Sequence, residues 1–174
     1  TLDGNVGENG LVALLETDAA GNTVLNGELL RGSELLFDDA VRFTRDLEIR
    51  DAELTRFTGG LEGLDDDDAR QGLDVTSEEF VLISGATPVI LEQLAVRGDG
   101  LARLDAEIDT TDGVLVEPAV RLEGDTLVRN DGSGAVTFGS AIDGPAILTI
   151  ENNGEIVIRG NVGQMQALQS LILR

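Results

Sequence analysis

The chain contains no cysteine, no histidine and no lysine, so all 12 of its basic residues are arginine. Without cysteine and histidine it has no disulfides, thiolate nucleophiles, Ser-His-Asp triads or zinc sites of the usual kind. Without lysine it has neither Schiff-base chemistry nor a phosphate-binding P-loop. Most of the common catalytic and cofactor-binding devices are therefore excluded, and we expect no cofactor.

Aromatic residues and proline are also scarce. Five phenylalanines, no tryptophan or tyrosine, and 3 prolines stand beside 22 glycines among 174 residues. Immunoglobulin-like sandwich domains usually hold a core tryptophan and a corner tyrosine, and both are missing. Apolar residues nevertheless make up 41% of the chain and charged residues 26%, which is ordinary for a folded soluble protein.

Basic residues are also few, since 33 acidic residues and 12 basic ones give a formal net charge of −21. Such a surface repels nucleic acid and anionic lipid, so we expect neither as a partner. No apolar run approaches the roughly 18 residues that span a bilayer, so membrane insertion is not expected either. A strongly acidic surface favours solubility and loose attraction of cations.

The sequence repeats itself at long range. Residues 11–43 line up with 90–122 at an offset of 79, as between Val41 and Val120. The offset then becomes 81 and later 77, and the drop of four predicts an insertion in the first copy near Asp65. We therefore predict one continuous solenoid over 1–174. Its parts are two similar units and a partial third, at about 4–84, 85–163 and 160–174.

The two ends of the chain show the same phase of the repeat. The string GNVG stands at 4–7 and again at 160–163, an interval close to twice the repeat. A natural domain would have distinct capping ends, so this pattern predicts a piece of a longer array. Its partners would be neighbouring repeats of the same parent chain. Open strand edges at the end coils would also allow end-to-end self-association.

Short stretches with alternating apolar residues predict β-strands with one face inside, such as Leu47-Glu-Ile49 and Val136-Thr-Phe138. Asn-Gly, Asp-Gly and Gly-Asn pairs separate them. A strand–turn cycle of about 20 residues is one coil of a parallel β-solenoid. We therefore predict an all-β parallel β-helix of about eight coils. The alternative is two tandem β-sandwich domains of about 79 residues each.

Four strings carry a family resemblance: GNTVLNGELL, LLFDDAVRF, GSGAVTFGSAIDGPAILTIENNGEIVIRGNVG and ALQSLIL. They resemble the repeats of very large bacterial surface exoproteins, the β-strand-repeat and filamentous-haemagglutinin-like adhesins. The resemblance covers about 1–57 and 115–174, and the chain departs from it in having more Asp, Glu and Arg and less Thr. The resemblance implies a right-handed winding, export by a dedicated secretion route, and an extracellular place at the bacterial cell surface.

One dense carboxylate cluster could hold a metal: Asp65, Asp66, Asp67 and Asp68. Oxygen ligands suit Ca²⁺, which makes these four residues weak candidates for a Ca²⁺ site. The run matches neither the Gly-rich nonapeptide of Ca²⁺-binding β-rolls nor the spacing of an EF-hand loop. A solvated acidic loop is the competing interpretation.

We predict a non-enzymatic structural or adhesive rod segment. A Ca²⁺-dependent module that binds a surface glycan or a protein is one alternative. A polysaccharide-active β-helix enzyme is a second, because scattered outward residues such as Asp109, Asp112 and Arg103 include the needed types. No carboxylate pair stands apart from the repeat pattern, so no catalytic residue is assigned.

Overall fold

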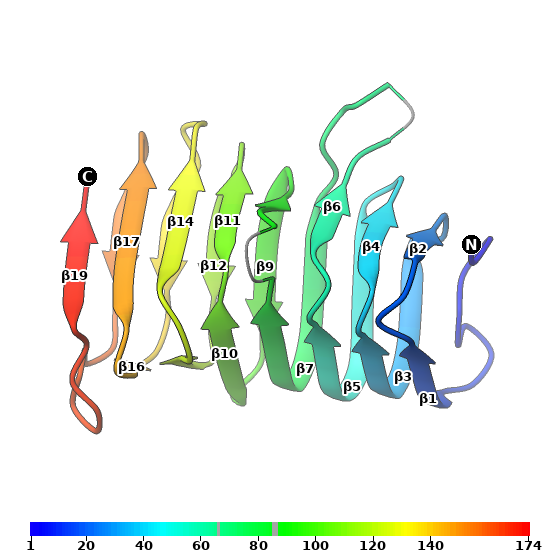
Figure 1. Cartoon of the computed structure of the whole chain (residues 1–174), viewed down its shortest axis with the longest axis horizontal. Helices are drawn as coiled ribbons and strands as arrows, with labels where there is room; N and C mark the ends of the chain where they lie inside the picture. The colour runs from blue at the N-terminus through cyan, green and yellow to red at the C-terminus, as the bar shows by residue number, and fades with distance from the viewer. Residues whose placement is uncertain (66, 85–86) are drawn as a thin grey trace.

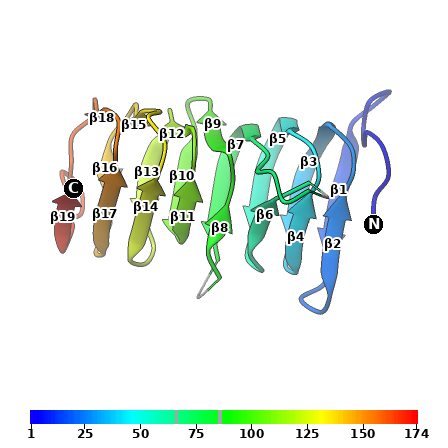
Figure 2. The ribbon, with the colours of Figure 1, turned by 90° about the horizontal axis from the view of Figure 1, so that it is seen from above.

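A computed structural model describes residues 1–65, 67–84 and 87–174, and this part of the chain contains strands and turns but no helix (Figure 1). The strands stack side by side along one axis, in the order in which the sequence visits them (Figure 2). On the near side of Figure 1 the strands run upward while the chain advances from right to left, so the winding is right-handed. The predicted β-solenoid is confirmed, with about eight coils, and tandem sandwich domains are not what the chain forms.

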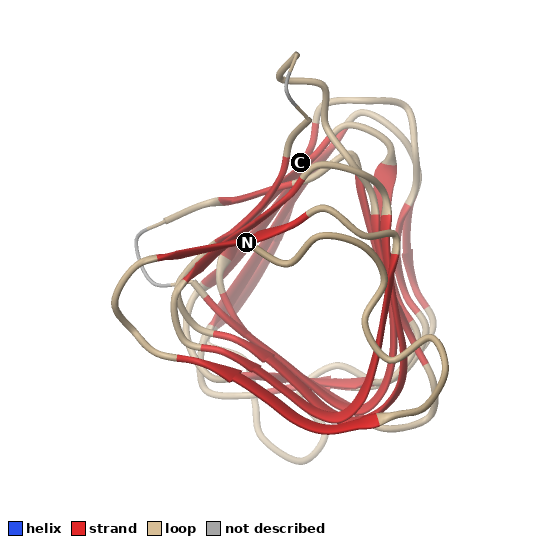
Figure 3. Cartoon of the chain, turned by 90° about the vertical axis from the view of Figure 1, so that its right-hand side faces the viewer, coloured by secondary structure: helices blue, strands red, loops and turns tan. Residues whose placement is uncertain are grey.

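The cross-section is triangular, and each coil contributes to three faces (Figure 3). The first face holds the N-terminal halves of β3 (Leu29–Phe37), β5 (Leu47–Phe57) and β7 (Leu73–Ile83), then β9 (Gln93–Arg97), β12 (Gly113–Val116), β15 (Val136–Phe138) and β18 (Ile156–Ile158). The second face holds β1 (Val12–Thr17), the C-terminal halves of β3, β5 and β7, then β10 (Leu101–Asp105), β13 (Ala119–Leu122) and β16 (Ile142–Asp143).

The third face is a separate eight-stranded sheet. It holds β2 (Asn22–Leu25), β4 (Ala40–Phe43), β6 (Leu61–Gly63), β8 (Val89–Ile90), β11 (Glu107–Thr110), β14 (Thr126–Asn130), β17 (Ile147–Asn152) and β19 (Ser170–Leu173). Every ladder between named strands is parallel. At about 4.8 Å per coil the rod is roughly 40 Å long.

Inward residues form columns along the axis, because successive strands pair without slipping on each face. Alternate side chains of a strand point to one side, so one residue in two enters the core. One column on the first face runs the whole length of the rod through Val6, Leu30, Ile49, Val75, Val96, Val116, Phe138 and Ile158. A second column on the second face runs through Leu15, Leu35, Thr55, Phe80, Ala102, Val120, Ile142 and Val162.

All five phenylalanines are buried in this single core. Phe37 and Phe57 stack with ring centroids 5.0 Å apart, and Phe80 meets Phe57 edge-on at 6.4 Å. Aliphatic residues fill most of the remaining core. The narrow interior explains why the aromatic content is low: it accommodates stacked phenylalanine rings in neighbouring coils and otherwise branched aliphatic chains.

Residues that the 79-residue offset pairs lie on different faces of the rod. Val41 is in β4 on the third face, whereas Val120 is in β13 on the second. Leu94 lies on the first face and Leu171, its partner at an offset of 77, on the third. The paired residues are eleven faces apart, which is four coils less one face. The two segments are therefore similar because their strands have similar patterns of buried residues. Residues that the alignment pairs do not occupy the same face of the rod.

Candidate functional surfaces

Ion pairs between successive coils dominate the outer surface. Among the described residues, ten of the twelve arginines bind carboxylates, and most of these pairs join residues about one coil apart in the sequence. Arg31 to Asp51 at 2.6 Å and Arg56 to Asp38 at 3.0 Å are examples. Because a parallel ladder places equivalent positions above one another, a one-coil spacing brings opposite charges into contact along the axis.

Three arginines each connect three coils. Arg97 reaches Asp74 in the preceding coil at 3.0 Å and Glu117 in the following one at 3.8 Å. Arg103 does the same with Glu79 at 2.8 Å and Glu123 at 3.3 Å. A guanidinium has donors on several edges and can therefore serve two carboxylates at once.

A third such clamp lies near the C-terminal end and shifts the pKa values of Arg129 and Glu151. Arg129 binds Glu107 at 3.1 Å and Glu151 at 3.4 Å, and Arg174 binds Glu151 at 2.8 Å. The hydrogen bond from Arg174, helped by Arg129, lowers the pKa of Glu151. Partial desolvation opposes the charge of Arg129, but its hydrogen bonds to Glu107 and Glu151 outweigh that and raise its pKa. Both shifts favour the charged forms, so Arg129 and Glu151 stay ionised at neutral pH.

The predicted Ca²⁺ candidates lie in a loop that projects from the rod after β6 (Figure 1). Asp65 uses its carboxylate within the loop: Oδ1 accepts the N–H groups of Asp67 at 2.9 Å and Ala69 at 2.8 Å. Asp68 adopts a positive φ of 60°. Asp66 lies outside the described residues. Among the described residues, no group of three or more acidic side chains is placed to hold a metal ion.

The residues considered for a catalytic role do not come together as a site. Asp109 lies on the third face near Arg70, 3.6 Å away, and Arg103 on the second face is held by two glutamates. Asp112 stands in the turn before β12, with its backbone N–H bound to the Glu92 carbonyl at 2.7 Å. The structure thus distributes these groups over different faces of the rod.

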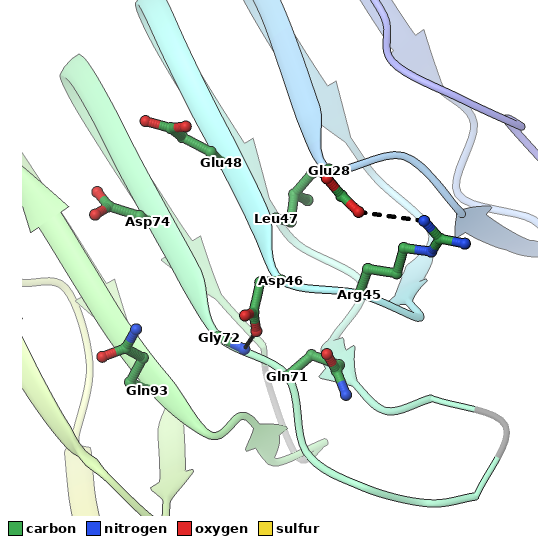
Figure 4. Close-up of a pocket in the computed structure, with 9 residues that line it drawn as sticks. All are labelled: Glu28, Arg45, Asp46, Leu47, Glu48, Gln71, Gly72, Asp74 and Gln93. Carbon is green, nitrogen blue, oxygen red and sulfur yellow. Dashed lines mark hydrogen bonds and ion pairs between the residues drawn. The ribbon is translucent and has the colours of Figure 1, made fainter.

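A groove of about 650 Å³ follows the corner between the third and first faces (Figure 4). Its carboxylates come from successive coils, and each is already engaged. Glu28 pairs with Arg45 at 3.2 Å, and Asp46 accepts the Gly72 N–H at 2.8 Å. Glu48 pairs with Arg50, and Asp74 with Arg97. The groove is therefore lined by carboxylates that ion pairs and hydrogen bonds hold in place between successive coils.

Two buried polar residues that the sequence pattern missed connect coils at the corners. The Asp39 carboxylate is 5% exposed and accepts the hydroxyls of Thr17 at 2.6 Å and Thr23 at 2.8 Å. Asn130 is 1% exposed and donates to the Asn152 side chain at 2.7 Å. Their partners are 16 to 22 residues away in sequence, so local alternation gave no signal of these contacts.

The two end coils form the most apolar exposed surface. Every large hydrophobic side chain that is exposed in the described part of the chain lies in the first or the last coil: Leu11, Leu14, Val162, Met165, Leu171 and Leu173. Within residues 1–65, 67–84 and 87–174, β1 pairs only with β3, β18 only with β15 and β19 only with β17, so the outer backbone groups of these edge strands have no strand partner there. Unpaired strand edges are templates for adding another strand.

Comparison of the chain with protein-family models, with curated proteins and with solved structures finds no match. In the described ranges no helix is long and apolar enough to cross a membrane.

Proposed function

We propose that the chain is a non-enzymatic spacer segment of a larger secreted protein at the bacterial cell surface, where a rigid rod holds other parts away from the cell. The observation that carries the proposal is the axial stacking: one core, two inward columns that run the full length of the rod and ion pairs from coil to coil. Such a stack resists bending because every coil is bonded to both neighbours.

The charged surface supports the same function. The axial pairs reduce repulsion between the carboxylates of successive coils and fix the register of those coils, although each exposed pair contributes only about 0–1 kcal/mol. The resemblance of the GNTVLNG and AVTFGSAIDG strings to exoprotein repeats supports placement in a surface adhesin. The partner in adhesion would be a surface glycan or protein that another part of the parent protein recognises.

The height of the rod above a surface tests the proposal. The chain is anchored by a C-terminal tag to a supported bilayer, and a fluorophore at the N-terminus reports its height by interference. We expect a narrow distribution near 40 Å, from eight coils at about 4.8 Å. A flexible Gly-Ser chain of the same length is the control, because it gives a broad distribution. An equally broad distribution for the solenoid would overturn the spacer function.

Two further measurements address the alternatives. Calorimetric titration with Ca²⁺ tests the metal-dependent module: no heat and no shift in melting temperature are expected.

Incubation with a panel of acidic and neutral polysaccharides tests the alternative that the chain is a polysaccharide-active enzyme. Turnover that a single carboxylate substitution abolishes would replace the spacer proposal with a catalytic one.

A further inference from the structure

The middle of the rod contains one step at which the third face is weakly bonded. β6 and β8 are neighbours in that sheet (Figure 2), yet their ladder joins a single residue pair, Glu62 with Ile90. The preceding ladder, from β4 to β6, joins three pairs, and the ladder from β14 to β17 joins five. Because paired residues of a ladder exchange backbone hydrogen bonds, the step from β6 to β8 is the least bonded one on the third face of the described chain.

The sequence around the two strands explains why the ladder is short. Pro88 directly precedes β8 and has no N–H to donate, so the ladder cannot extend on that side. Gly60, with a φ of 102°, directly precedes β6, and the chain leaves the sheet after Gly63. The step from Glu62 to Ile90 spans 28 residues, so the residues in excess of one coil project at the corners and add nothing to the ladder.

The other two faces are firmly bonded at the same step. The ladder from β7 to β9 on the first face joins four pairs, and the ladder from β7 to β10 on the second joins five. An arginine also crosses the step on each of these faces, since Arg97 binds Asp74 and Arg103 binds Glu79. Opening at this step therefore begins on the third face, while the first and second faces hold the coils together.

Arg70 spans the weak step from outside the rod. It follows β6 in the chain, and its bridge with Leu64 keeps it beside the end of that strand. Its Nη1 donates to the carbonyl of Leu91, next to β8, at 3.4 Å and to the carbonyl of Asp109, in β11, at 3.3 Å. The same nitrogen lies 3.6 Å from Asp109 Oδ1, a buried atom without a hydrogen-bond partner among the described residues. One side chain thus connects three coils where the ladder is shortest.

We propose that the step from β6 to β8 is a seam, marked by the Glu62–Ile90 pair, at which the folded rod opens locally, and that Arg70 is the strap that holds this seam closed. Local opening starts where the fewest bonds must break, so parts of one fold open with different free energies. Opening here leaves the two inward columns on the first and second faces intact. The seam is a property of the fold. Its role as the point where the rod yields to load and recloses rests on the proposed spacer function.

Native-state hydrogen exchange measures the opening at two similar corner bonds. The Glu92 N–H donates across the seam to the Gln71 carbonyl at 2.9 Å, and the Asp131 N–H donates to the Thr110 carbonyl at 3.0 Å, two coils later. After correction for intrinsic rates, we expect the Glu92 amide to exchange about tenfold faster than the Asp131 amide. Equal protection of the two amides would contradict the seam.

Two arginine substitutions that remove the same charge separate the strap from a general effect of charge. Arg70→Met keeps an unbranched side chain without donors, so the Glu92 amide should exchange about fivefold faster than in the unaltered chain, with Asp131 unchanged. Arg45→Met removes an exposed arginine whose ion pair with Glu28 joins the coils of β2 and β4, and should change neither amide. Equal acceleration of both amides by Arg70→Met, or acceleration of neither, would show that Arg70 is no strap.

A disulfide across the seam provides a test in a chain that keeps Arg70. The chain has no cysteine, and Glu62 and Ile90 are paired on the outer side of the third face. Glu62→Cys combined with Ile90→Cys should form a bridge on oxidation, because directly paired strand residues lie within disulfide reach. We expect the oxidised form to slow exchange of the Glu92 amide to the level of Asp131, and reduction to reverse the effect.

The control bridge lies in the well-bonded ladder from β14 to β17. Leu127→Cys combined with Thr149→Cys joins another outward pair and should leave exchange at Glu92 unchanged. If the bridge across the seam also leaves Glu92 exchanging as before, opening does not occur at the seam and the proposal is wrong. A rod without a seam that still stands at a uniform height keeps the spacer function, so the two proposals fail separately.

Discussion

The N-terminal and C-terminal halves of the rod turn the same corner in two different ways. In β3, β5 and β7 a single strand of 9 to 11 residues bends from the first face to the second. In the later coils two short strands meet at a turn, as where Gly98, Asp99 and Gly100 separate β9 from β10. The inward columns nevertheless continue without interruption through both halves.

The local sequence at the corner accounts for the difference. In β5 the bend falls at Asp51, a non-glycine residue with a φ of 59°, next to the buried Ala52. The equivalent corner in the coil that follows β7 lies between β9 and β10. There Gly98 has a positive φ of 110°. Positive φ is inexpensive for glycine and strained for other residues. Corner geometry can therefore vary from coil to coil while the core register is kept.

The largest expected effect comes from the aromatic packing that only the N-terminal half contains. Phe57→Ala removes the middle ring of the Phe37–Phe57–Phe80 cluster and should destabilise the rod by about 3–5 kcal/mol. Leu104→Ala, in the same axial column of the C-terminal half, should cost about 2–4 kcal/mol. Denaturant unfolding measures both. A smaller loss for Phe57→Ala than for Leu104→Ala would show that the ring cluster adds nothing.

The next effect concerns the buried polar residues of the two halves. Asp39→Ala leaves the Thr17 and Thr23 hydroxyls without their acceptor and should cost about 2–3 kcal/mol. Hydrogen exchange should show the loss in the first two coils only, because each coil contacts only its neighbours. Asn130→Ala is the corresponding variant in the C-terminal half of the rod. There hydrogen exchange should become faster only in the coils around β14. Uniformly faster exchange along the rod would contradict coil-by-coil stability.

The corner itself can be tested with substitutions that differ only in their backbone preference. Asp51→Ala and Asp51→Gly both remove the ion pair with Arg31. Alanine keeps the strain of positive φ, so it should be about 1 kcal/mol less stable than glycine at this position. Gly98→Ala should cost a similar amount, because its nearest obstacle, the Ser77 carbonyl oxygen, is 3.5 Å from the added Cβ. Equal melting temperatures for the two Asp51 variants would show that the corner is unstrained.

A stabilising substitution is expected inside the core. Thr55 is fully buried in a column of otherwise apolar residues, and its hydroxyl has no hydrogen-bond partner in the part of the chain that the structure describes. Thr55→Val should therefore raise the free energy of unfolding by about 1 kcal/mol. Thr110→Val is the matched control in the other half, because the Thr110 hydroxyl donates to Arg129 and Asn130 and its loss should destabilise. A loss of stability in Thr55→Val would mean that the hydroxyl is satisfied in solution.

The smallest effect is a pH dependence at the C-terminal clamp. Because the pKa of Glu151 is lowered in the folded chain, its stabilising contribution is complete above the ordinary glutamate value of about 4.3. That contribution is lost as the pH falls through the lowered pKa. Glu151→Gln should therefore melt slightly earlier than the unaltered chain at pH 7 and equally at low pH. A difference that grows toward low pH would contradict the shift.

The coil architecture could be predicted from the sequence, whereas the contacts between coils could not. Alternation such as Leu47-Glu-Ile49 places one residue in two inside the core, and the turn signals give coils of about 20 residues. The actual step between paired residues varies from 18, between Asn22 and Ala40, to 28, between Glu62 and Ile90. Ion pairs along the axis depend on that step at every coil, so their partners become visible only in the structure.

Buried polar residues were missed for a related reason. The pattern treats Asp39 and Thr55 as outward residues because their side chains are polar. Asp39 is buried since two threonines from the preceding coil meet its carboxylate, and Thr55 lies in a column that is otherwise apolar. The acidic run at 65–68 predicts a cation site because four carboxylates are adjacent in sequence, whereas in the structure the Asp65 carboxylate accepts hydrogen bonds from N–H groups of its own loop.

A distance between two spin labels tests most directly that the chain is one rigid rod. The chain contains no cysteine, so Glu16→Cys and Asn161→Cys provide two exposed labelling sites on the second face, at opposite ends of the rod. Seven coil steps of about 4.8 Å separate them, and we predict a single narrow distance distribution near 34 Å. A broad distribution, or two separate distances that exchange, would contradict a continuous stack and the spacer function built on it.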